Sequence, residues 1–341
     1  MKYALALLSL LSVALVALLW RQKDALILKE RGSFYVGGEN VARDFVELGS
    51  FCAADTVTIN QMYVEYMKPV GKQRIPVVLT HGAGLSGACY DTTPDGRTGW
   101  FDYFVRNGFP TYVVDQVGRA RSRFDQTVFN NVGAGRTPPE KQPKISRMGD
   151  LHASWINFRI GAEKGVPYPD TQFPVDAVSE LSKMSIADLS ASLNAPDPNY
   201  KALAELADEL GGAVLIGHSQ SGHYPLESAL INPEKVKGMV LLEAVPPVYS
   251  DEQIAALAKI PLLIVYGDHL ESSTEGAPTT WRQRFDECAA LVDRVNKAGG
   301  NAQMIHLPAK GMRGNTHMFM QDKNNLAVAD LIIGWIKENI K

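Results

Sequence analysis

The sequence predicts an α/β protein in which a mostly parallel central sheet has helices on both faces. Several short apolar runs lack the alternation of apolar and polar residues that a half-exposed strand shows, as expected of strands buried on both faces of a parallel sheet. The runs span residues 75–80, 111–115, 213–216, 239–242 and 262–266. Segments with helical spacing separate most of these runs, and strands that alternate with helices are typical of α/β folds.

Three segments have the signals of the flanking helices. In the first segment, residues 199–210, Leu203 and Leu206 lie on one face of the expected helix. Ser250 followed by Gln253 is typical of the start of a helix. The three segments cover residues 199–210, residues from 250 onward, and residues 326–340. Ahead of the central strands, residues 32–67 combine β-prone pieces, glycine turns and an alternating stretch, which predicts an antiparallel edge of the sheet.

The composition is that of a globular chain, with 45% apolar and 21% charged residues in a length of 341. Its 37 acidic and 34 basic residues leave a net charge of −3, so no basic surface is expected to attract nucleic acid. The length fits one α/β domain of about 250 residues or more with an inserted segment. We therefore expect residues 23–341 to form a single domain.

One connection between the predicted strands is far longer than the others. Nearly a hundred residues separate the run at 111–115 from the run at 213–216. A connection of that length is usually functional. Trp155 and Phe158 within it favour packed structure over a disordered spacer. We expect residues 123–196 to form a cap inserted over the functional site.

The N-terminus has the pattern of an export signal. Lys2 precedes an uncharged apolar run over residues 3–20, and basic residues follow directly. The run is long for the core of a signal peptide and just long enough to span a bilayer, and no clear cleavage site follows it. Residues 1–22 are therefore expected to be either a cleaved signal peptide or a retained membrane anchor of an exported protein, secreted or periplasmic.

Export favours an oxidising compartment, in which the three cysteines allow at most one internal disulfide. Cys52 would pair with Cys89 if the N-terminal segment folded back over the loop after the first central strand. In the alternative, Cys52, Cys89 and Cys288 are all buried free thiols.

The stretch Gly-Ala-Val-Leu-Ile-Gly-His-Ser-Gln-Ser-Gly at residues 212–222 predicts a nucleophile elbow. An apolar strand ends at Gly217 and a helix is expected to follow, so Ser219 stands on a tight turn with its hydroxyl exposed. Small residues two positions either side of the serine allow the turn to approach neighbouring strands. The usual second glycine is replaced by Ser221, and Pro225 is expected to disturb the start of the helix.

A serine hydroxyl is a weak nucleophile, so Ser219 needs a base, and imidazole suits that role near pH 7. Of the seven histidines, His317 is favoured because it lies on a Gly/Asn-rich loop between the last strand and the last helix. His81 is expected to shape its glycine loop, and His306 to be a strand residue. The remaining histidines adjoin the elbow or belong to the surface or cap: His152, His218, His223 and His269.

A tetrahedral oxyanion needs two preorganised N–H donors beside the serine. Gln220, the residue after the serine, is expected to supply one. The glycine loop after the first central strand is expected to supply the other, from Ala83 or its neighbour Gly82, because glycines let the backbone turn its amides inward. Gly84 and Met318 are the candidate substrate contacts.

These landmarks occur in the order of the α/β-hydrolase superfamily, which the chain resembles over residues 60–341. Three further stretches resemble a little-studied group of bacterial and fungal esterase-like proteins. They are Thr-Thr-Pro-Asp-Gly-Arg (92–97), Val-Val-Asp-Gln-Val-Gly-Arg-Ala-Arg-Ser (113–122) and Asn-Thr-His-Met-Phe-Met-Gln-Asp (315–322). The resemblance implies the fold of that superfamily, with a catalytic Ser, acid and His in that chain order.

The acid orients the imidazole and stabilises its cation, so it must follow a strand near the histidine loop. The commoner position in the superfamily is after strand seven, where Asp268 stands. The resembling group has a glutamate after strand six, where Glu243 stands. We favour Glu243, whose extra methylene can cross the added gap, and keep Asp268 as the alternative.

The resemblance implies a hydrolase that acts on a small-molecule carboxylic ester through an acyl-enzyme on Ser219, without a cofactor, and the N-terminal pattern predicts that it is exported. Alternatives on the same fold are a lactonase, a thioesterase, a non-hydrolytic lyase or isomerase and, less favoured, a non-catalytic binder. The spacing Gly-x-Gly-x-x-Gly from Gly82 to Gly87, with Asp115 ending the next strand, is a weak dinucleotide signal. No His-x-x-x-His or Cys-x-x-Cys spacing in the sequence predicts a metal site.

Overall fold

The computed structural model describes residues 25–147, 153–274 and 279–340. The predicted leader, residues 1–22, lies outside these ranges. Within them, no helix combines the length and the apolar character needed to cross a bilayer.

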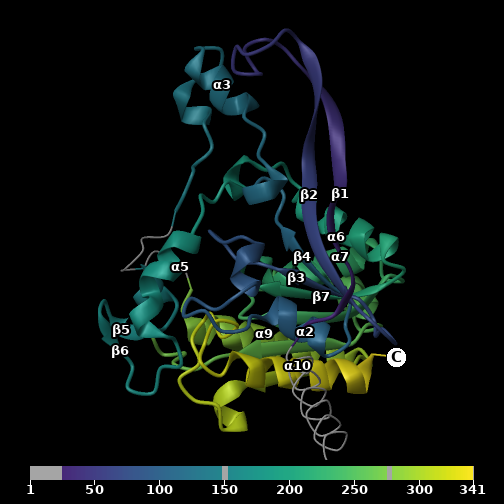
Figure 1. Ribbon diagram of the computed structural model, residues 1–341, viewed down its shortest axis with the longest axis vertical. Helices are drawn as coiled ribbons and strands as arrows, with labels where there is room; N and C mark the ends of the chain where they lie inside the picture. The colour runs from purple at the N-terminus through teal and green to yellow at the C-terminus, as the bar shows by residue number, and fades with distance from the viewer. Residues whose placement is uncertain (1–24, 148–152, 275–278, 341) are drawn as a thin grey trace, which may run out of the picture.

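The structure is built on an eight-stranded sheet in the order β1-β2-β4-β3-β7-β8-β9-β10 (Figure 1). From β4 to β10 all neighbouring strands are parallel, whereas β2 runs antiparallel to both β1 and β4. The strands are β1 (Leu28–Arg43), β2 (Asp55–Pro69), β3 (Val77–Thr80), β4 (Thr111–Asp115), β7 (Ala213–His218), β8 (Val236–Leu242), β9 (Leu262–Tyr266) and β10 (Ala302–His306). The predicted α/β class with a mostly parallel sheet is confirmed.

The central strands lack sequence alternation because both faces of the sheet are covered. Every residue of β3, β4, β7 and β9 is buried. Neighbouring residues of one strand therefore enter two different cores: Leu215 packs in one hydrophobic cluster, and Val214 and Ile216 pack in the other. The pleat sends successive side chains to opposite faces, and here both faces are apolar.

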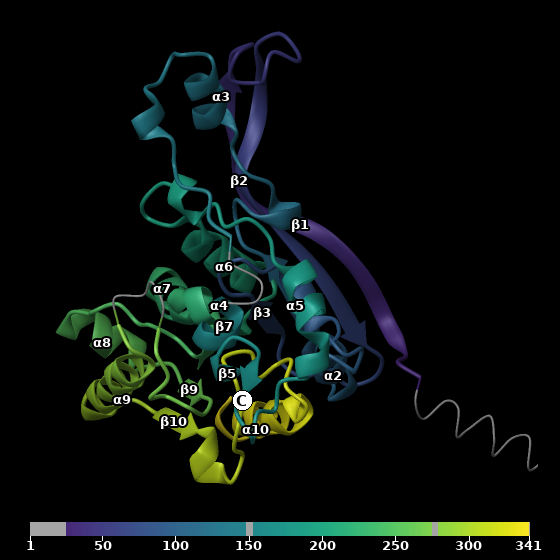
Figure 2. The same cartoon turned by 90° about the vertical axis from the view of Figure 1, so that its left-hand side faces the viewer.

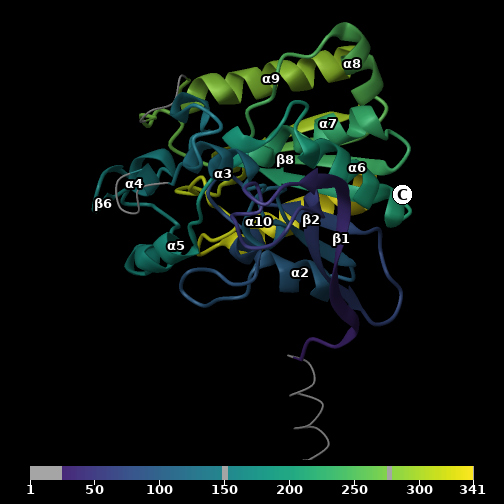
Figure 3. The same cartoon turned by 90° about the horizontal axis from the view of Figure 1, so that it is seen from above.

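Helices form a layer on each side of the sheet (Figure 3). On one side lie α6 (Pro198–Glu209), α7 (Tyr224–Ile231), α8 (Asp251–Leu257) and α9 (Trp281–Lys297). On the other lie α2 (Trp100–Arg106) and α10 (Asn325–Asn339). The three predicted helices correspond to α6, α8 and α10. Ser250 caps α8 as expected, since its hydroxyl accepts from the Gln253 N–H and the Gln253 side chain accepts from the Ser250 N–H.

The predicted antiparallel edge is a single long hairpin of β1 and β2 that extends well beyond the helical layers (Figure 2). Its tip packs against α3 (Thr127–Gly133), the first helix after β4. The side-chain amide of Asn130 donates to the Glu47 carbonyl at 2.8 Å, and Arg136 forms an ion pair with Asp44. The first part of the long β4–β7 connection therefore supports the hairpin.

The rest of that connection is a series of short elements beside the carboxyl ends of the central strands. They are α4 (Ala153–Asn157), β5 (Gly161–Glu163), β6 (Val166–Pro167), α5 (Val178–Met184) and the 3₁₀ turns at Val175–Ala177 and Ser190–Ser192. A further 3₁₀ turn, Pro139–Lys141, follows α3. Trp155, Phe158 and Leu181 are buried and join the core on the α2/α10 side of the sheet. Other 3₁₀ turns lie at Gly87–Tyr90, Ala120–Ser122, Ser219–His223 and Leu307–Lys310.

The cysteines differ from both sequence-based alternatives. All three are free, so the Cys52–Cys89 disulfide is absent. Cys89 lies buried beside the central sheet, whereas Cys52 is exposed in the turn at the far tip of the hairpin. The β1–β2 hairpin extends outward as a β-ribbon, which carries Cys52 away from the loop after β3. Cys89 and Cys288 are buried thiols, as the second alternative expected, but Cys52 is not.

Candidate active site

The predicted elbow forms where β7 ends. Ser219 has a φ of +57°, in the left-handed region that non-glycine residues rarely adopt, and it opens a 3₁₀ turn that leads into α7. A Cβ at Gly217 would overlap the carbonyl oxygen of Ser221, which explains why glycine is needed there. Ser219 remains partly exposed, whereas the residues of β7 behind it are buried.

Ser221 is tolerated at the usual glycine position because it has a structural role. Its buried hydroxyl accepts from the His218 N–H and lies 3.0 Å from the Thr80 carbonyl, to which it can donate. The position that needs glycine is instead 222, because a Cβ at Gly222 would lie 2.6 Å from the Cβ of Ala244. Pro225 stands in the first turn of α7, where its missing N–H leaves no helical hydrogen bond unmade.

Two hydrogen bonds join the serine, a histidine and a glutamate. His317 Nε2 lies 2.8 Å from Ser219 Oγ, and His317 Nδ1 lies 3.2 Å from Glu243 Oε2. In the neutral imidazole, Nδ1–H therefore donates to the carboxylate and Nε2 is free to accept the serine proton. Glu243 and His317 are buried.

Asp268, the alternative acid, is held elsewhere. Its Oδ1 accepts from the His269 N–H at 2.7 Å and its Oδ2 accepts from the Gly314 N–H at 2.9 Å. The bond from Gly314 fastens the loop after β9 to the loop after β10. The structure thus brings Glu243, and not Asp268, to the imidazole.

Comparison with known proteins identifies the family of the chain. A novel bacterial esterase of known structure is 42% identical to this chain with a TM-score of 0.87, and the match covers 93% of this chain and 98% of the esterase. The chain belongs to the α/β-hydrolase-fold esterases. A probable secreted lipase, phiG of Fungal sp. (strain ATCC 74256), is 25% identical over 325 residues, covering 81% of this chain and 86% of the lipase. No family model matches the sequence.

In this esterase the second oxygen of Glu243 contacts a residue that the sequence analysis missed. Arg159 Nη2 donates to Glu243 Oε1 at 2.6 Å, and the Gly267 N–H donates to the same oxygen at 2.5 Å. Burial by itself would raise the pKa of Glu243, but the Arg159 charge and the His317 hydrogen bond outweigh burial and hold that pKa at about 2. Arg159 lies between Phe158 and Ile160 in the long connection, and no motif marks it.

His317 is surrounded by rings. Those of Trp281 and His218 lie 4.5 and 4.7 Å from it between centroids, and that of Phe158 lies 5.4 Å away. Burial lowers the pKa of His317, Glu243 opposes that effect, and the cations of Arg159 and Arg284 add to it. The imidazole is therefore held in its neutral form, the form that can accept a proton.

The loop that holds His317 is fastened by the buried carboxyl group of Asp322. Asp322 accepts from the Thr316 N–H and the Thr316 hydroxyl, both at 2.8 Å, and from the Asn315 side chain at 3.0 Å. Arg97 donates to the carbonyls of Gln321 and Asp322. Two of the motifs that resemble the esterase-like group, at 92–97 and 315–322, thus contact each other and position the histidine.

The predicted oxyanion loop lies against the elbow. A Cβ at Gly82 would lie 2.9 Å from the Cβ of Ser219, so only glycine fits at that position. Ala83 and Gln220 are partly exposed beside the serine. The Gly84 carbonyl accepts from the Ile186 N–H at 2.8 Å, which joins this loop to the long connection.

Gln220 is fixed by a buried ion pair. Arg119 Nη1 donates to Gln220 Oε1 at 2.6 Å, and Arg119 Nη2 lies 3.0 Å from Asp188 Oδ1. Asp188 belongs to the long connection, so the residue after the serine is also tied to that segment. Met318, a predicted substrate contact, has no exposed surface and packs in the core. A substrate would reach it only after rearrangement, and its role stays a prediction.

The other histidines have structural partners. His81 links its own loop to the residue after β4, since Nδ1 lies 2.8 Å from the Gly82 carbonyl and Nε2 accepts from the Gln116 N–H. His218 Nε2 donates to the His317 carbonyl at 2.9 Å. His223 contacts the Tyr200 hydroxyl, His269 pairs with Asp170, and His306 packs on Phe285. His152 lies outside the described residues.

The carboxylate of the weak dinucleotide signal and one cluster of possible metal ligands both have structural partners. Asp115 is held by the Gly87 N–H at 2.7 Å and by Arg121 at 2.6 Å, so its carboxylate fastens the glycine loop. Asp170, Asp268 and His269 bring ligand atoms within 4.8 Å of one another. Their bonds to each other and to backbone N–H groups account for that cluster.

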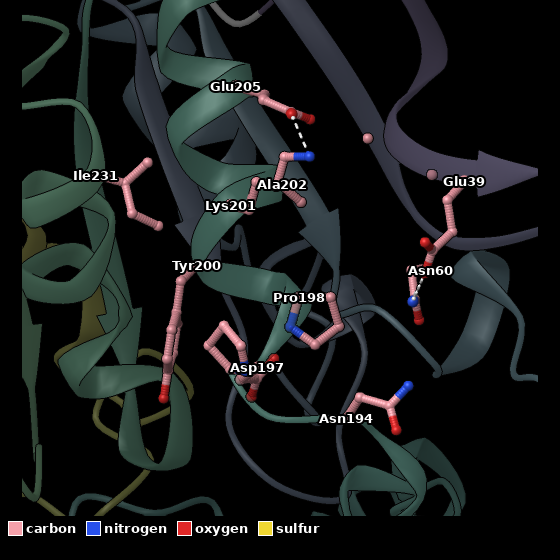
Figure 4. A pocket seen from close by; sticks show the side chains of 13 residues that line it. Glu39, Asn60, Asn194, Asp197, Pro198, Tyr200, Lys201, Ala202, Glu205 and Ile231 are labelled. Atoms are coloured by element: carbon pink, nitrogen blue, oxygen red, sulfur yellow. Dashed lines mark hydrogen bonds and ion pairs between the residues drawn. The ribbon is translucent and has the colours of Figure 1, made fainter.

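A pocket of about 250 Å³ lies between the hairpin and the N-terminal part of α6 (Figure 4). Glu39, Asn60 and Tyr200 are among its lining residues, and Asn60 donates to Glu39 at 2.6 Å across the hairpin. Ser219, Glu243 and His317 do not line it. The pocket is therefore separate from the active-site residues.

The raised pKa of Asp322 should make the protein less stable as the pH rises. Burial raises its pKa to about 7 in the folded protein, against about 3.9 for an unperturbed aspartate. The folded state therefore favours the protonated carboxyl. The contribution of Asp322 to the free energy of unfolding is complete below about pH 4 and is lost as the pH rises through about 7. Asp322→Asn stays neutral, so its unfolding free energy relative to wild type should rise over that range, by at most about 4 kcal/mol.

Denaturant unfolding at pH 4 and pH 8 measures the difference. Asp268→Asn is the matched control, because backbone N–H groups of Gly314 and His269 overcome the effect of burial and lower the pKa of Asp268. Its stability gap should stay nearly constant between these two pH values, because its carboxyl titrates at or below about pH 4 in both the folded and the unfolded state. A gap for Asp322→Asn that is the same at both pH values would contradict the prediction.

Proposed function

We propose that this esterase hydrolyses a carboxylic ester through an acyl-enzyme, with Ser219 as nucleophile, His317 as general base and Glu243 as the acid that orients the base. One observation supports this proposal above all others: the hydrogen-bonded series from Ser219 Oγ to His317 Nε2 and from His317 Nδ1 to Glu243 Oε2, at 2.8 and 3.2 Å. The order and spacing of the groups fit nucleophilic catalysis by an activated serine.

In the first half-reaction, His317 Nε2 takes the Ser219 proton as Oγ bonds to the ester carbonyl carbon. The negative charge moves to the carbonyl oxygen, beside the N–H groups of Ala83 and Gln220. The intermediate then collapses, the carbon–oxygen bond to the alcohol breaks, and His317 returns its proton to the leaving alcohol. Water, deprotonated by His317, attacks the acyl-enzyme in the same way and releases the carboxylic acid.

The residues around the triad favour this sequence. Glu243 stays ionised and compensates the positive charge that forms on His317 in each half-reaction. We propose residues 123–196 as the cap of the site, with Gly84 and the segment near Ile186 and Asp188 at its edge. The contacts of that segment with the oxyanion loop and with Gln220 support this role.

Removal of the nucleophile is the first test. Ser219→Ala should abolish turnover of p-nitrophenyl esters without loss of folded structure, and a fluorophosphonate should label Ser219 in the wild type. His317→Ala should lose several orders of magnitude in turnover and should not label, because the members of a triad act as a unit. Peptide mapping identifies the labelled residue, and a label on Ser221 would rule out the proposed nucleophile.

The acid is tested with neutral amides. Glu243→Gln removes the charge that stabilises the imidazolium, which can lower kcat by about 10⁴-fold. Asp268→Asn removes a carboxylate that makes only backbone hydrogen bonds and should stay within about tenfold of wild type, the equivalent of roughly 1.4 kcal/mol. Steady-state kinetics on both folded variants separate the two carboxylates, and an inactive Asp268→Asn enzyme would reverse the assignment.

We further propose that residues 1–22 direct export, on the strength of the apolar run at 3–20 with its basic flanks. When the full chain is expressed and the cells are fractionated, the enzyme should be found outside the cytoplasm or in the membrane fraction. N-terminal sequencing of the recovered enzyme then distinguishes the two forms of the leader. A shortened N-terminus indicates a cleaved signal, and an intact one in the membrane indicates an anchor. Intact enzyme in the soluble cytoplasmic fraction would refute export.

A further inference from the structure

Arg159 lies in the connection between β4 and β7, and its side chain reaches the active site from there. It follows α4 in the long connection and takes a left-handed backbone conformation, with a φ of +58°. Its N–H donates to the Ile156 carbonyl at 3.0 Å, so a tight turn at the end of α4 aims the side chain inward. No part of the side chain is exposed.

The guanidinium has three partners from three different elements. Nη2 donates to Glu243 Oε1 after β8 at 2.6 Å, and Nε donates to the Asp268 carbonyl after β9 at 2.7 Å. Its plane lies over the ring of Trp281, the first residue of α9, at 4.4 Å. A planar fork fixed at this many points has little freedom to move, and lysine could not reproduce it.

These contacts determine which way Glu243 faces. Arg159 and the Gly267 N–H both hold Oε1, which leaves Oε2 directed to His317 Nδ1. The Glu243 side chain is also fully buried. A buried carboxylate without a cation would tend to take up a proton and lose its attraction for the imidazolium.

We propose that Arg159 is a positioning residue of the triad, supplied by the inserted segment, and that its charge sets the pH at which the His317–Glu243 pair takes up its first proton. The proposal rests on the assignment of these two residues as base and acid. The partners of the Arg159 side chain are Glu243, the Asp268 carbonyl and Trp281, so it acts on the triad through Glu243. A docked α4 turn is then a condition for an oriented acid.

Several other titratable or charged groups face this pair. They are His218 at the end of β7, Asp268 after β9, His306 at the end of β10, Asp322 on the histidine loop and Arg284 on α9. Arg284 lies on Trp281 at 4.6 Å and donates to the Thr279 hydroxyl, not to Glu243. Burial raises the pKa values of Tyr266 and Cys288, so both remain neutral in the working range.

The sign of the pH effect follows from charge. The Arg159 cation opposes proton uptake by the His317–Glu243 pair, whichever of the two residues holds the proton. Arg159→Met should therefore move the acid limb of the kcat/KM profile to higher pH, by about one pH unit, a shift typical of a neighbouring charge. Its kcat/KM at the optimum should fall by more than tenfold but by less than the roughly 10⁴-fold that loss of the acid can cause.

Arg159→Lys separates charge from geometry. It keeps a cation near Glu243, so its acid limb should stay close to that of wild type while kcat/KM still falls, because an ammonium group cannot reproduce the fork. Arg284→Met is the matched control, since it removes a second cation that lies over Trp281 and makes no hydrogen bond to Glu243. It should give a smaller shift of the limb and a kcat/KM within a few fold of wild type.

The experiment records pH profiles of kcat/KM for the three folded variants, with circular dichroism as the check of folding. An unchanged acid limb in Arg159→Met would overturn the proposal even if the rate fell, because a purely structural role lowers the rate without moving the limb. If Arg159→Met does not fold, an Arg159→Lys enzyme with wild-type kcat/KM overturns it. The fluorophosphonate labelling of Ser219 is independent and tests the triad itself.

Discussion

The buried carboxylate of Glu243 is the constraint around which the site is arranged. A negative charge without contact to water is stable only if donors and a cation surround it. Those donors come from three parts of the chain that are far apart in sequence: Arg159 in the inserted segment, Gly267 after β9 and His317 after β10. Satisfying this one group therefore brings the inserted segment and two loops to the carboxyl edge of the sheet.

A second constraint is the limited space between the elbow and its neighbouring strands. Ser219 adopts a left-handed backbone, and the residues around it must be small where the turn touches its neighbours. Gly217 and Gly222 meet that need, which leaves Ser221 free to bind backbone groups with its hydroxyl. The departure from the usual motif thus changes the hydrogen bonding of the turn and leaves its shape intact.

The long connection between β4 and β7 has two tasks. Its first helix, α3, braces the tip of the projecting hairpin, and the later part binds the residues at the site. Arg159 contacts the proposed acid, Asp188 the Arg119–Gln220 pair, and Ile186 the oxyanion loop. The connection is in this way bound directly to the residues of the proposed site.

The sequence by itself determined the fold class and the main candidates for catalysis. Buried parallel strands need unbroken apolar runs, and an elbow needs small residues at fixed spacing, so both leave local signals that can be recognised. Chain order pointed to His317, and a resemblance to related proteins favoured Glu243. Only the tertiary structure decided that Glu243 and not Asp268 meets the imidazole, because that depends on how two loop ends are directed. The same holds for Arg159 and for the unpaired Cys52, since a long-range ion pair and the path of a hairpin depend on contacts between distant segments that leave no pattern along the chain.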